Sequence, residues 1–190
     1  MDQLSDQQRI EAIASHIENI ITLLGENTNR EGLARTPMRA AKALWHLTSG
    51  YRQDVDRVVG QALFAHEGSQ VVVVKDIEFY SLCEHHVLPF FGKISVGYIP
   101  DGKIVGLSKV ARIVEVFARQ LQVQERMTAQ IADEVQRITG AKGVIAVCSG
   151  EHLCMKMRGV EKQHSSTTTI HYNGAFSDPV LRSEVLNAIK

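Results

Sequence analysis

The residues with the clearest chemistry form the cluster Cys83-Glu84-His85-His86, which follows an apolar stretch and precedes Pro89. Cys83 and His86 have C-x-x-H spacing, so one tight turn can direct a thiolate and an imidazole at the same ion. Two ligands do not establish a site, because a buried thiol beside two polar histidines gives the same pattern. The cluster therefore predicts at most part of a metal centre.

A second segment, 152–158, predicts the remaining ligand. It alternates as a strand does, with leucine and methionine on one face and His152, Cys154, Lys156 and Arg158 on the other. We expect the strand to run over about 143–158, and Cys154 to be the third ligand. Three protein ligands and one open position are typical of catalytic zinc, whereas structural sites usually close all four positions.

The remaining cysteine, Cys148, is expected in the core. In an extended strand it lies about 20 Å from Cys154, at roughly 3.3 Å per residue, and an apolar run precedes it. A turn at Ser149-Gly150 would instead fold it back. Cys148 or a histidine would then close the site, and the chain would be a binding protein with a structural zinc rather than an enzyme.

Proton transfer and anion binding have their own candidates. His85 adjoins a proposed ligand and points elsewhere, which suits an imidazole that moves protons. Each basic residue taken alone is an ordinary surface charge. Together they would form a phosphate clamp, because charge-assisted hydrogen bonds to phosphate are strong. The basic residues in question are Arg39, Lys42, Lys109, Arg112, Lys156 and Arg158.

The elements that must position these residues follow from periodicity and capping signals. Helices are expected at about 6–25, 36–50, 108–120 and 124–139, with Thr36 and Ser108 as caps, Gly140 as a stop, and a short helix after Asp178-Pro179. Strands are expected at about 71–80, 90–99, 143–158 and 164–171. Strands grouped around a helix pair indicate an α+β fold with an antiparallel sheet. We divide the chain into an N-terminal helical region, 1–60, and a catalytic domain, 61–190.

Composition excludes several classes of protein. A hydrophobic fraction of 44% rules out a disordered chain, and 21 basic against 21 acidic residues give no net charge to favour nucleic acid. Apolar runs of four or five residues are far short of the roughly 20 that span a bilayer, which predicts no membrane partner. An N-terminus without signal-peptide character and three cysteines predict a cytoplasmic protein whose cysteines act as thiols.

Five ordered motifs resemble those of GTP cyclohydrolase I, the zinc enzyme that begins pterin and folate synthesis, and together they span about 30–176. The first is Thr36-Pro37-Met38-Arg39-Ala40-Ala41-Lys42, the second Cys83-Glu84-His85-His86, and the third Gly106-Leu107-Ser108-Lys109 with Arg112. The fourth is Gln122-Val123-Gln124-Glu125-Arg126, and the fifth His152-Leu153-Cys154-Met155-Lys156-Met157-Arg158-Gly159.

The resemblance implies the tunnelling fold, an antiparallel sheet with helices on one side and an N-terminal helical extension. Subunits of this kind assemble into a multi-subunit β-barrel, a homodecamer of two pentamers with active sites between subunits. The resemblance implies zinc (Zn²⁺) binding by Cys83, His86 and Cys154, and proton transfer by His85 and His152. It implies that Glu125 and Gln124 bind the guanine and that Ser108 contacts the ribose. The residues implied to bind the triphosphate are Arg39, Lys42, Lys109, Arg112 and Arg158. Lys156 is not part of the family pattern.

The implied reaction is hydrolytic opening of the guanine imidazole ring of GTP, with release of formate and rearrangement to 7,8-dihydroneopterin triphosphate. Two other enzymes of the same fold, the nitrile reductase of queuosine synthesis and the zinc-independent cyclohydrolase, are alternatives. The Cys/His/Cys set argues against the reductase. Zinc deaminases are excluded, because the chain has no P-C-x-x-C string.

Overall fold

The computed structural model describes residues 4–189. The chain forms two compact units that part between Ser49 and Gly50, and each is described by itself. Among the described residues, no helix has the length and apolar character needed to cross a membrane.

The N-terminal unit is a pair of packed helices, α1 (Asp6–Leu23) and α2 (Thr36–Leu47). Helix α1 begins with a capping box, in which Ser5 and Gln8 each accept a hydrogen bond from the other's backbone N–H. Helix α2 begins one residue earlier than expected. Thr36 is its first residue and Arg35 occupies the cap position without a side-chain hydrogen bond, so the prediction of a Thr36 cap is wrong.

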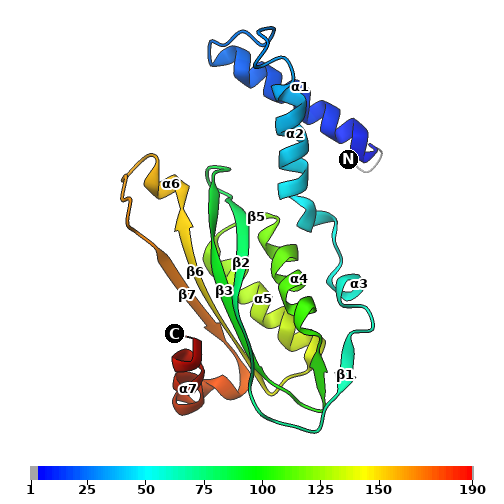
Figure 1. Cartoon of the computed structure of the whole chain (residues 1–190), viewed down its shortest axis with the longest axis vertical. Coiled ribbons are helices and arrows are strands. Elements are labelled where there is room, and N and C mark those ends of the chain that lie inside the picture. The colour runs from blue at the N-terminus through cyan, green and yellow to red at the C-terminus, as the bar shows by residue number, and fades with distance from the viewer. Residues whose placement is uncertain (1–3, 190) are drawn as a thin grey trace. The chain divides into compact units, whose positions relative to one another are not determined.

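The second unit is built on a five-stranded sheet with the order β5-β2-β3-β6-β7 (Figure 1). All neighbouring strands are antiparallel except β2 and β5, which form a short parallel pair. The α+β class and the largely antiparallel sheet are therefore confirmed. The strands are β2 (Val72–Cys83), β3 (Pro89–Ile99), β5 (Leu121–Gln122), β6 (Gly143–His152) and β7 (Thr167–Tyr172).

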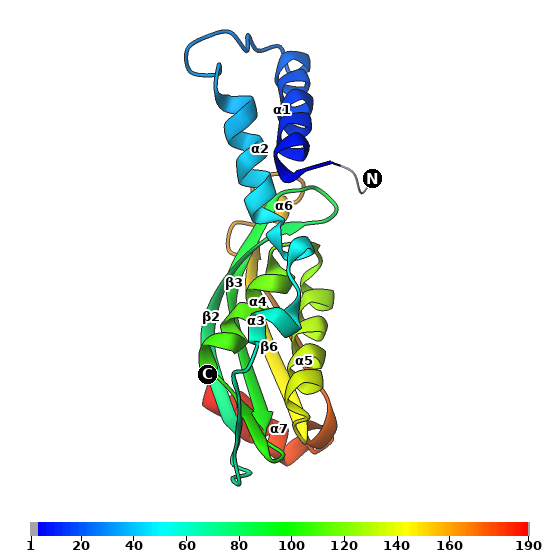
Figure 2. The same cartoon turned by 90° about the vertical axis from the view of Figure 1, so that its right-hand side faces the viewer.

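Two helices, α4 (Leu107–Ala118) and α5 (Gln124–Thr139), cover one face of this sheet (Figure 2). Fully buried side chains such as Phe79, Ile113 and Ile131 form the core between them. Helix α5 ends as expected at Gly140, which adopts φ +63°. Helix α4 is capped by Gly106, so Ser108 lies inside its first turn and not at the cap. The smaller elements are a 3₁₀ turn (Ser49–Arg52), α3 (Val55–Val59), a two-stranded sheet of β1 (Leu63–Ala65) and β4 (Lys103–Val105), α6 (Leu153–Lys156), a second 3₁₀ turn (Gly174–Ser177) and α7 (Pro179–Ile189).

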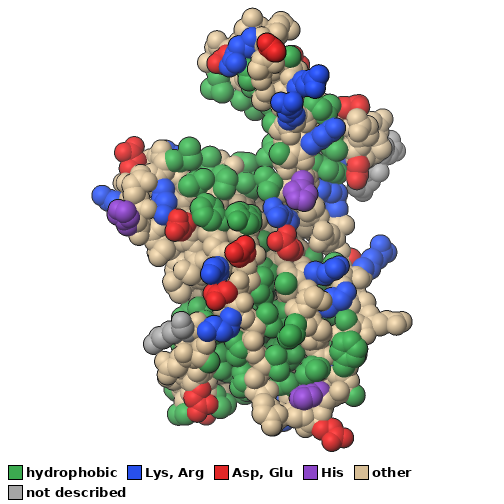
Figure 3. Space-filling view, in the orientation of Figure 1, with side chains coloured by type: hydrophobic (Ala, Val, Ile, Leu, Met, Phe, Trp, Pro, Cys, Tyr) green, Lys and Arg blue, Asp and Glu red, His purple; other side chains and the backbone are tan. Residues whose placement is uncertain are grey.

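The other face of the sheet is covered only in part. Val185 of α7 packs with Ile145 and Phe176 in a small second core on this side. Beyond α7, large apolar side chains stay exposed, including Tyr80 and Ile170. Figure 3 shows hydrophobic side chains gathered over the strands and mixed with charges of both signs.

One predicted strand is wrong at its C-terminal end. Strand β6 stops at His152, and the chain then turns into the short helix α6, closed by a 3.0 Å bond from Met157 N to Leu153 O. The alternation seen in 152–158 therefore does not describe a strand face. Cys154 reaches its position because the chain curls at the strand end, which places it on a helical turn.

Candidate metal centre and adjoining pocket

Cys83, His86 and Cys154 come together as one group. Their ligand atoms all lie within 4.8 Å of one another, with both cysteines buried and His86 exposed. Cys83 is the last residue of β2, His86 lies in the connection from β2 to β3, and Cys154 lies on α6 after β6. The prediction that these three residues form one potential metal site is thus confirmed, and the identity of the metal stays a prediction.

The connection from Cys83 to Leu88 is closed by its own backbone. Cys83 N donates to Leu88 O at 2.8 Å, and Val87 N donates to Cys83 O at 2.8 Å. Val87 has φ +53°, which is unfavourable for a β-branched residue. Such strain persists only where surrounding contacts impose it, and it is concentrated at functional sites.

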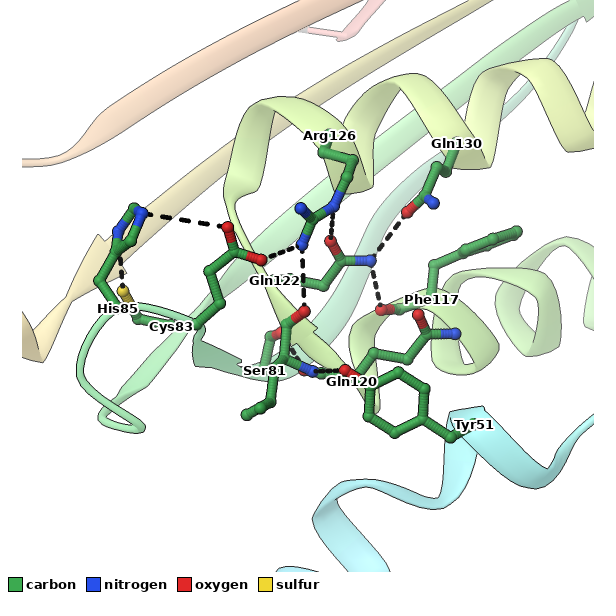
Figure 4. A network of polar contacts seen from close by, with 11 residues as sticks. Tyr51, Ser81, Cys83, His85, Phe117, Gln120, Gln122, Arg126 and Gln130 are labelled. Atoms are coloured by element: carbon green, nitrogen blue, oxygen red, sulfur yellow. Dashed lines mark hydrogen bonds and ion pairs between the residues drawn. The ribbon is translucent and has the colours of Figure 1, made fainter. Parts of the chain in front are cut away.

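A polar network joins this connection to the segment between α4 and α5 (Figure 4). Arg126 is its hub: the guanidinium donates to the carboxylate of Glu84, to Gln122 Oε1 at 3.0 Å and to Leu121 O at 3.1 Å. Gln122 in turn donates to Phe117 O and to Gln130 Oε1, as Figure 4 also shows. The Arg126 guanidinium holds the pKa of Glu84 below its usual value. Glu84 therefore stays ionised and paired with Arg126, at a position between Cys83 and His86 in the chain.

The donor atoms of this group fit a divalent cation. Burial raises the pKa of Cys154 above the usual thiol value, and the neighbouring Cys83 raises it further. Two buried thiols in contact cannot both ionise readily, but a coordinated divalent cation reverses this balance because the ligating sulfur is then deprotonated outright. Two sulfurs and one imidazole fit zinc, which takes soft thiolate and imidazole ligands.

A cavity of about 210 Å³ lies beside this group. Glu125 lines it from the first turn of α5, and His152 lines it from the end of β6. The His152 ring stacks on Phe90, with centroids 4.7 Å apart and planes 3° from parallel. Its Nε2 lies 2.8 Å from Gln124 Oε1. The full lining is Cys83, His85, His86, Gln122, Val123, Gln124, Glu125, His152, Cys154, Met155 and Thr167.

The two histidines that are not ligands differ in environment. Burial lowers the pKa of His152, and the Glu125 carboxylate opposes this shift in part. The imidazole of His152 is therefore neutral near pH 7. His85 is largely exposed, with Nε2 3.9 Å from the carboxylate of Glu84 and Nδ1 3.9 Å from Cys83 Sγ. Both sit where a molecule in the cavity can exchange protons with them.

The predicted phosphate-binding residues do not all meet at this cavity. Arg158 is close, with Nη1 3.1 Å from His86 Nε2. Ser108, Lys109 and Arg112 lie in the first half of α4, whereas the end of α4 leads to β5 and the metal group. Arg39 and Lys42 are exposed on α2 in the other unit, so their role stays a prediction.

Cys148 is separate from the ligand group, as expected. Its side chain is fully buried in the sheet–helix core, and burial raises its pKa to about 12. Within the described residues it joins no cluster of potential ligands. The prediction of a core thiol is confirmed.

Sequence reasoning missed the supports of the site. The sequence analysis gave Arg126, Gln122 and Phe90 no role of their own in the site. The available signal was their position, since Gln122 and Arg126 lie at the two ends of the fourth motif and Phe90 follows His86 by four residues.

Comparisons with known proteins show which sequences the chain is similar to. The profile of the GTP cyclohydrolase I family matches residues 13–190. GTP cyclohydrolase 1 of Bacteroides thetaiotaomicron is 54% identical over 181 residues, covering 95% of this chain and 92% of the relative. GTP cyclohydrolase 1 2 of Pseudomonas aeruginosa is 56% identical over 180 residues, covering 94% and 99%, and the Porphyromonas gingivalis enzyme is 49% identical over 189, covering 100% and 98%. Among solved structures, the apo archaeosine synthase QueF-Like has a TM-score of 0.46 at 14% identity, covering 57% of this chain and 98% of that one.

Proposed function

The chain belongs to the GTP cyclohydrolase I family, and from that membership we propose that Cys83, His86 and Cys154 hold the zinc ion of its active site. The protein is an enzyme that opens the guanine imidazole ring of GTP by hydrolysis, releases formate and forms 7,8-dihydroneopterin triphosphate, which begins pterin and folate synthesis. Its sheet and helix pair are those of the tunnelling fold. The assignment of 61–190 as the catalytic domain is part of the proposal.

The observation that carries the proposed site is the convergence of the three ligands beside a cavity that Glu125 and His152 also line. Zinc bound there would supply Lewis acidity, which makes water a nucleophile near neutral pH. The imidazoles of His152 and His85 would move protons to and from the purine nitrogen and the later open-chain intermediates. Ser108 would contact the ribose.

Recognition of the base is assigned to Glu125. A carboxylate accepts two hydrogen bonds side by side, and guanine offers N1–H and its 2-amino group as adjacent donors. Adenine lacks both donors at those positions. Glu125 would therefore select GTP over ATP, while Arg39, Lys42, Lys109, Arg112 and Arg158 would bind the triphosphate.

We further propose that two subunits share each site. A cavity of about 210 Å³ is below the roughly 300–1,000 Å³ of typical small-molecule sites, so one chain encloses only part of a nucleotide. The first turn of α4, with Ser108 and Lys109, lies about a helix length, ~18 Å, from the end that leads to β5. Lys109 also donates to Val58 O at 2.7 Å in its own chain. These residues would serve the cavity of a neighbouring subunit.

The exposed apolar sheet face supports assembly, because large uncovered apolar surfaces mark protein–protein contacts. We propose a decamer of two pentamers, about 211 kDa for ten chains of 21.1 kDa, which light scattering measures directly.

The sharing of each active site between two subunits is tested by complementation. Cys83→Ser and Lys109→Ala are each expected to be inactive, and their co-assembled mixture to regain about a quarter of the activity by random pairing. A mixed oligomer without activity would refute shared sites.

The activity itself is tested by incubating the metal-loaded protein with GTP. We expect stoichiometric formate and, after oxidation, a fluorescent pterin. Cys83→Ser and Cys154→Ser should lose both bound zinc and product, whereas Cys148→Ser should retain them. Absence of formate from zinc-loaded wild-type protein would disprove the proposed function.

A cytoplasmic location is proposed from the three free thiols.

A further inference from the structure

The side chain of Gln124 is one of the few buried polar groups in the protein. It is 1% exposed, at the start of α5 and beneath β6 and β7. Its Nε2 lies 3.2 Å from Cys148 O, 2.9 Å from Thr167 O and 3.2 Å from Thr169 Oγ1. A side-chain amide has two donor hydrogens, so both are already engaged inside the chain.

These contacts fix which way round the amide lies. Backbone carbonyls can only accept, so the NH₂ group of Gln124 must face Cys148 and Thr167. Its Oε1 then faces His152 Nε2 at 2.8 Å. An amide oxygen can only accept as well, so the hydrogen in this bond must belong to His152 Nε2. In the neutral imidazole the second nitrogen, Nδ1, is therefore the unprotonated one.

The surroundings leave no room for another arrangement. Gly150 lies against the amide, and a Cβ there would come within 2.6 Å of Gln124 Oε1. Thr128 Oγ1 holds the start of α5 by donating to Gln124 O at 2.7 Å. The His152 ring is stacked on Phe90, which fixes the plane of the ring. The hydrogen bond to the Gln124 amide fixes the direction in which Nε2 points. Among the residues that the structure describes, none hydrogen-bonds to Nδ1 of His152.

We propose that Gln124 is a positioning residue, which holds His152 as the Nε2–H tautomer so that His152 exchanges its proton with bound substrate through Nδ1. Nδ1 takes a proton from the attacking water and passes it to the purine nitrogen as the water oxygen bonds to the ring carbon, which leaves the imidazole neutral with its hydrogen still on Nε2. This inference rests on the proposed function. It replaces the guanine contact that the family resemblance implies for Gln124, because the amide has no donor left for a ligand.

The kinetic test compares Gln124→Met with Gln136→Met, the same substitution near the other end of α5. We expect Gln124→Met to lower kcat by about 10²-fold and to leave KM and the GTP dissociation constant within about twofold, because misplacement of a catalytic group affects turnover. Gln136→Met should match wild type. A raised KM or weakened GTP binding with kcat preserved would overturn the proposal and return Gln124 to the guanine site.

Two further variants separate positioning from loss of structure. In a His152→Ala background, adding Gln124→Met should change kcat no further, because the two residues act as one unit. Independent, multiplying effects would contradict this. Gly150→Ala keeps every side chain of the site and displaces the amide oxygen, so it should reproduce the kcat loss of Gln124→Met. Wild-type kinetics in Gly150→Ala would also count against the proposal.

The tautomer is measured without any turnover. Protein labelled with ¹⁵N in its histidine rings, compared with a His152→Ala sample, identifies the His152 signals by NMR. We expect a protonated Nε2 and an unprotonated Nδ1 in wild type, and loss of that preference in Gly150→Ala. A protonated Nδ1 in wild type would refute the inference even if the enzyme is active. Failure of the proposed function would instead show as wild-type protein that releases no formate, while the NMR result still decides the tautomer.

Discussion

The three thiols should fall into two reactivity classes once metal is removed. We consider a chelator-treated protein and an untreated one, each exposed to Ellman's reagent at pH 8 under native conditions. With metal bound, no thiol should react quickly, because Cys83 and Cys154 are coordinated and Cys148 is buried. After chelation Cys83 and Cys154 should react, Cys154 the more slowly because its pKa is raised, and Cys148 should react far more slowly than either until the protein unfolds.

The size of the difference follows from ionisation. Burial raises the pKa of Cys148 to about 12, so about one molecule in 10⁴ is thiolate at pH 8. A thiol with the ordinary pKa of about 8.5 is about one quarter ionised at that pH. Ionisation alone therefore slows Cys148 by roughly 10³-fold. Because its pKa lies far above the assay pH, its rate should rise about tenfold for each unit of pH until the protein unfolds.

Matched variants identify the classes. Cys148→Ala should remove only the slow thiol and keep about one metal ion per chain. Cys83→Ser should remove one fast thiol together with the bound metal. The reasoning would be refuted by three equally fast thiols in the native metal-free protein, or by two thiols that stay slow after chelation.

Three further outcomes follow from the structure. Arg126→Met should weaken metal binding by about 10- to 100-fold in a chelator competition, because the contact that holds Glu84 is lost. The control Arg137→Met breaks only surface ion pairs and should leave metal binding unchanged. Gly140→Ala should lower the free energy of unfolding by about 1 kcal/mol and the melting temperature by about 2–4 °C, because Gly140 has φ +63° and alanine is strained there. An unchanged melting temperature would show that alanine is not strained at this position. Glu125→Gln should reduce the preference for GTP over ATP by about 10² or more in competition assays, and a fully selective variant would mean that the guanine pocket is elsewhere.

Local signals predicted the elements whose ends are marked in the sequence. Helix α5 matches the expected 124–139 because Gly140 terminates it, and α1 begins where Ser5 and Gln8 form their capping box. The end of β6 was missed for a physical reason. Alternation in 152–158 satisfies the strand period, but packing of Cys154 against the metal group requires the chain to curl there. Tertiary contact overrides a local pattern of this length.

The site was predictable only as far as residue type reveals function. Cysteine and histidine at ligand spacing indicate a metal centre, so the three residues of the potential metal site were predictable from the sequence. Gln124 gives no such signal, because glutamine at a helix start is usually a surface residue. Its burial depends on Gly150 and on carbonyls of two strands that are close only in the folded sheet.

The ligand group also depends on how three strands align. Leu82 pairs with Pro89 between β2 and β3, and Phe90 pairs with His152 between β3 and β6. A slip of one residue in either ladder would reverse the faces of the strand and shift its end by about 3.4 Å. Metal coordination tolerates only about 0.2 Å, so a misaligned chain would present two ligands without the third. Metal binding at this group would therefore discriminate against mispaired sheets, and scarcity of the metal would then increase the fraction of newly made chains that are trapped in the wrong alignment.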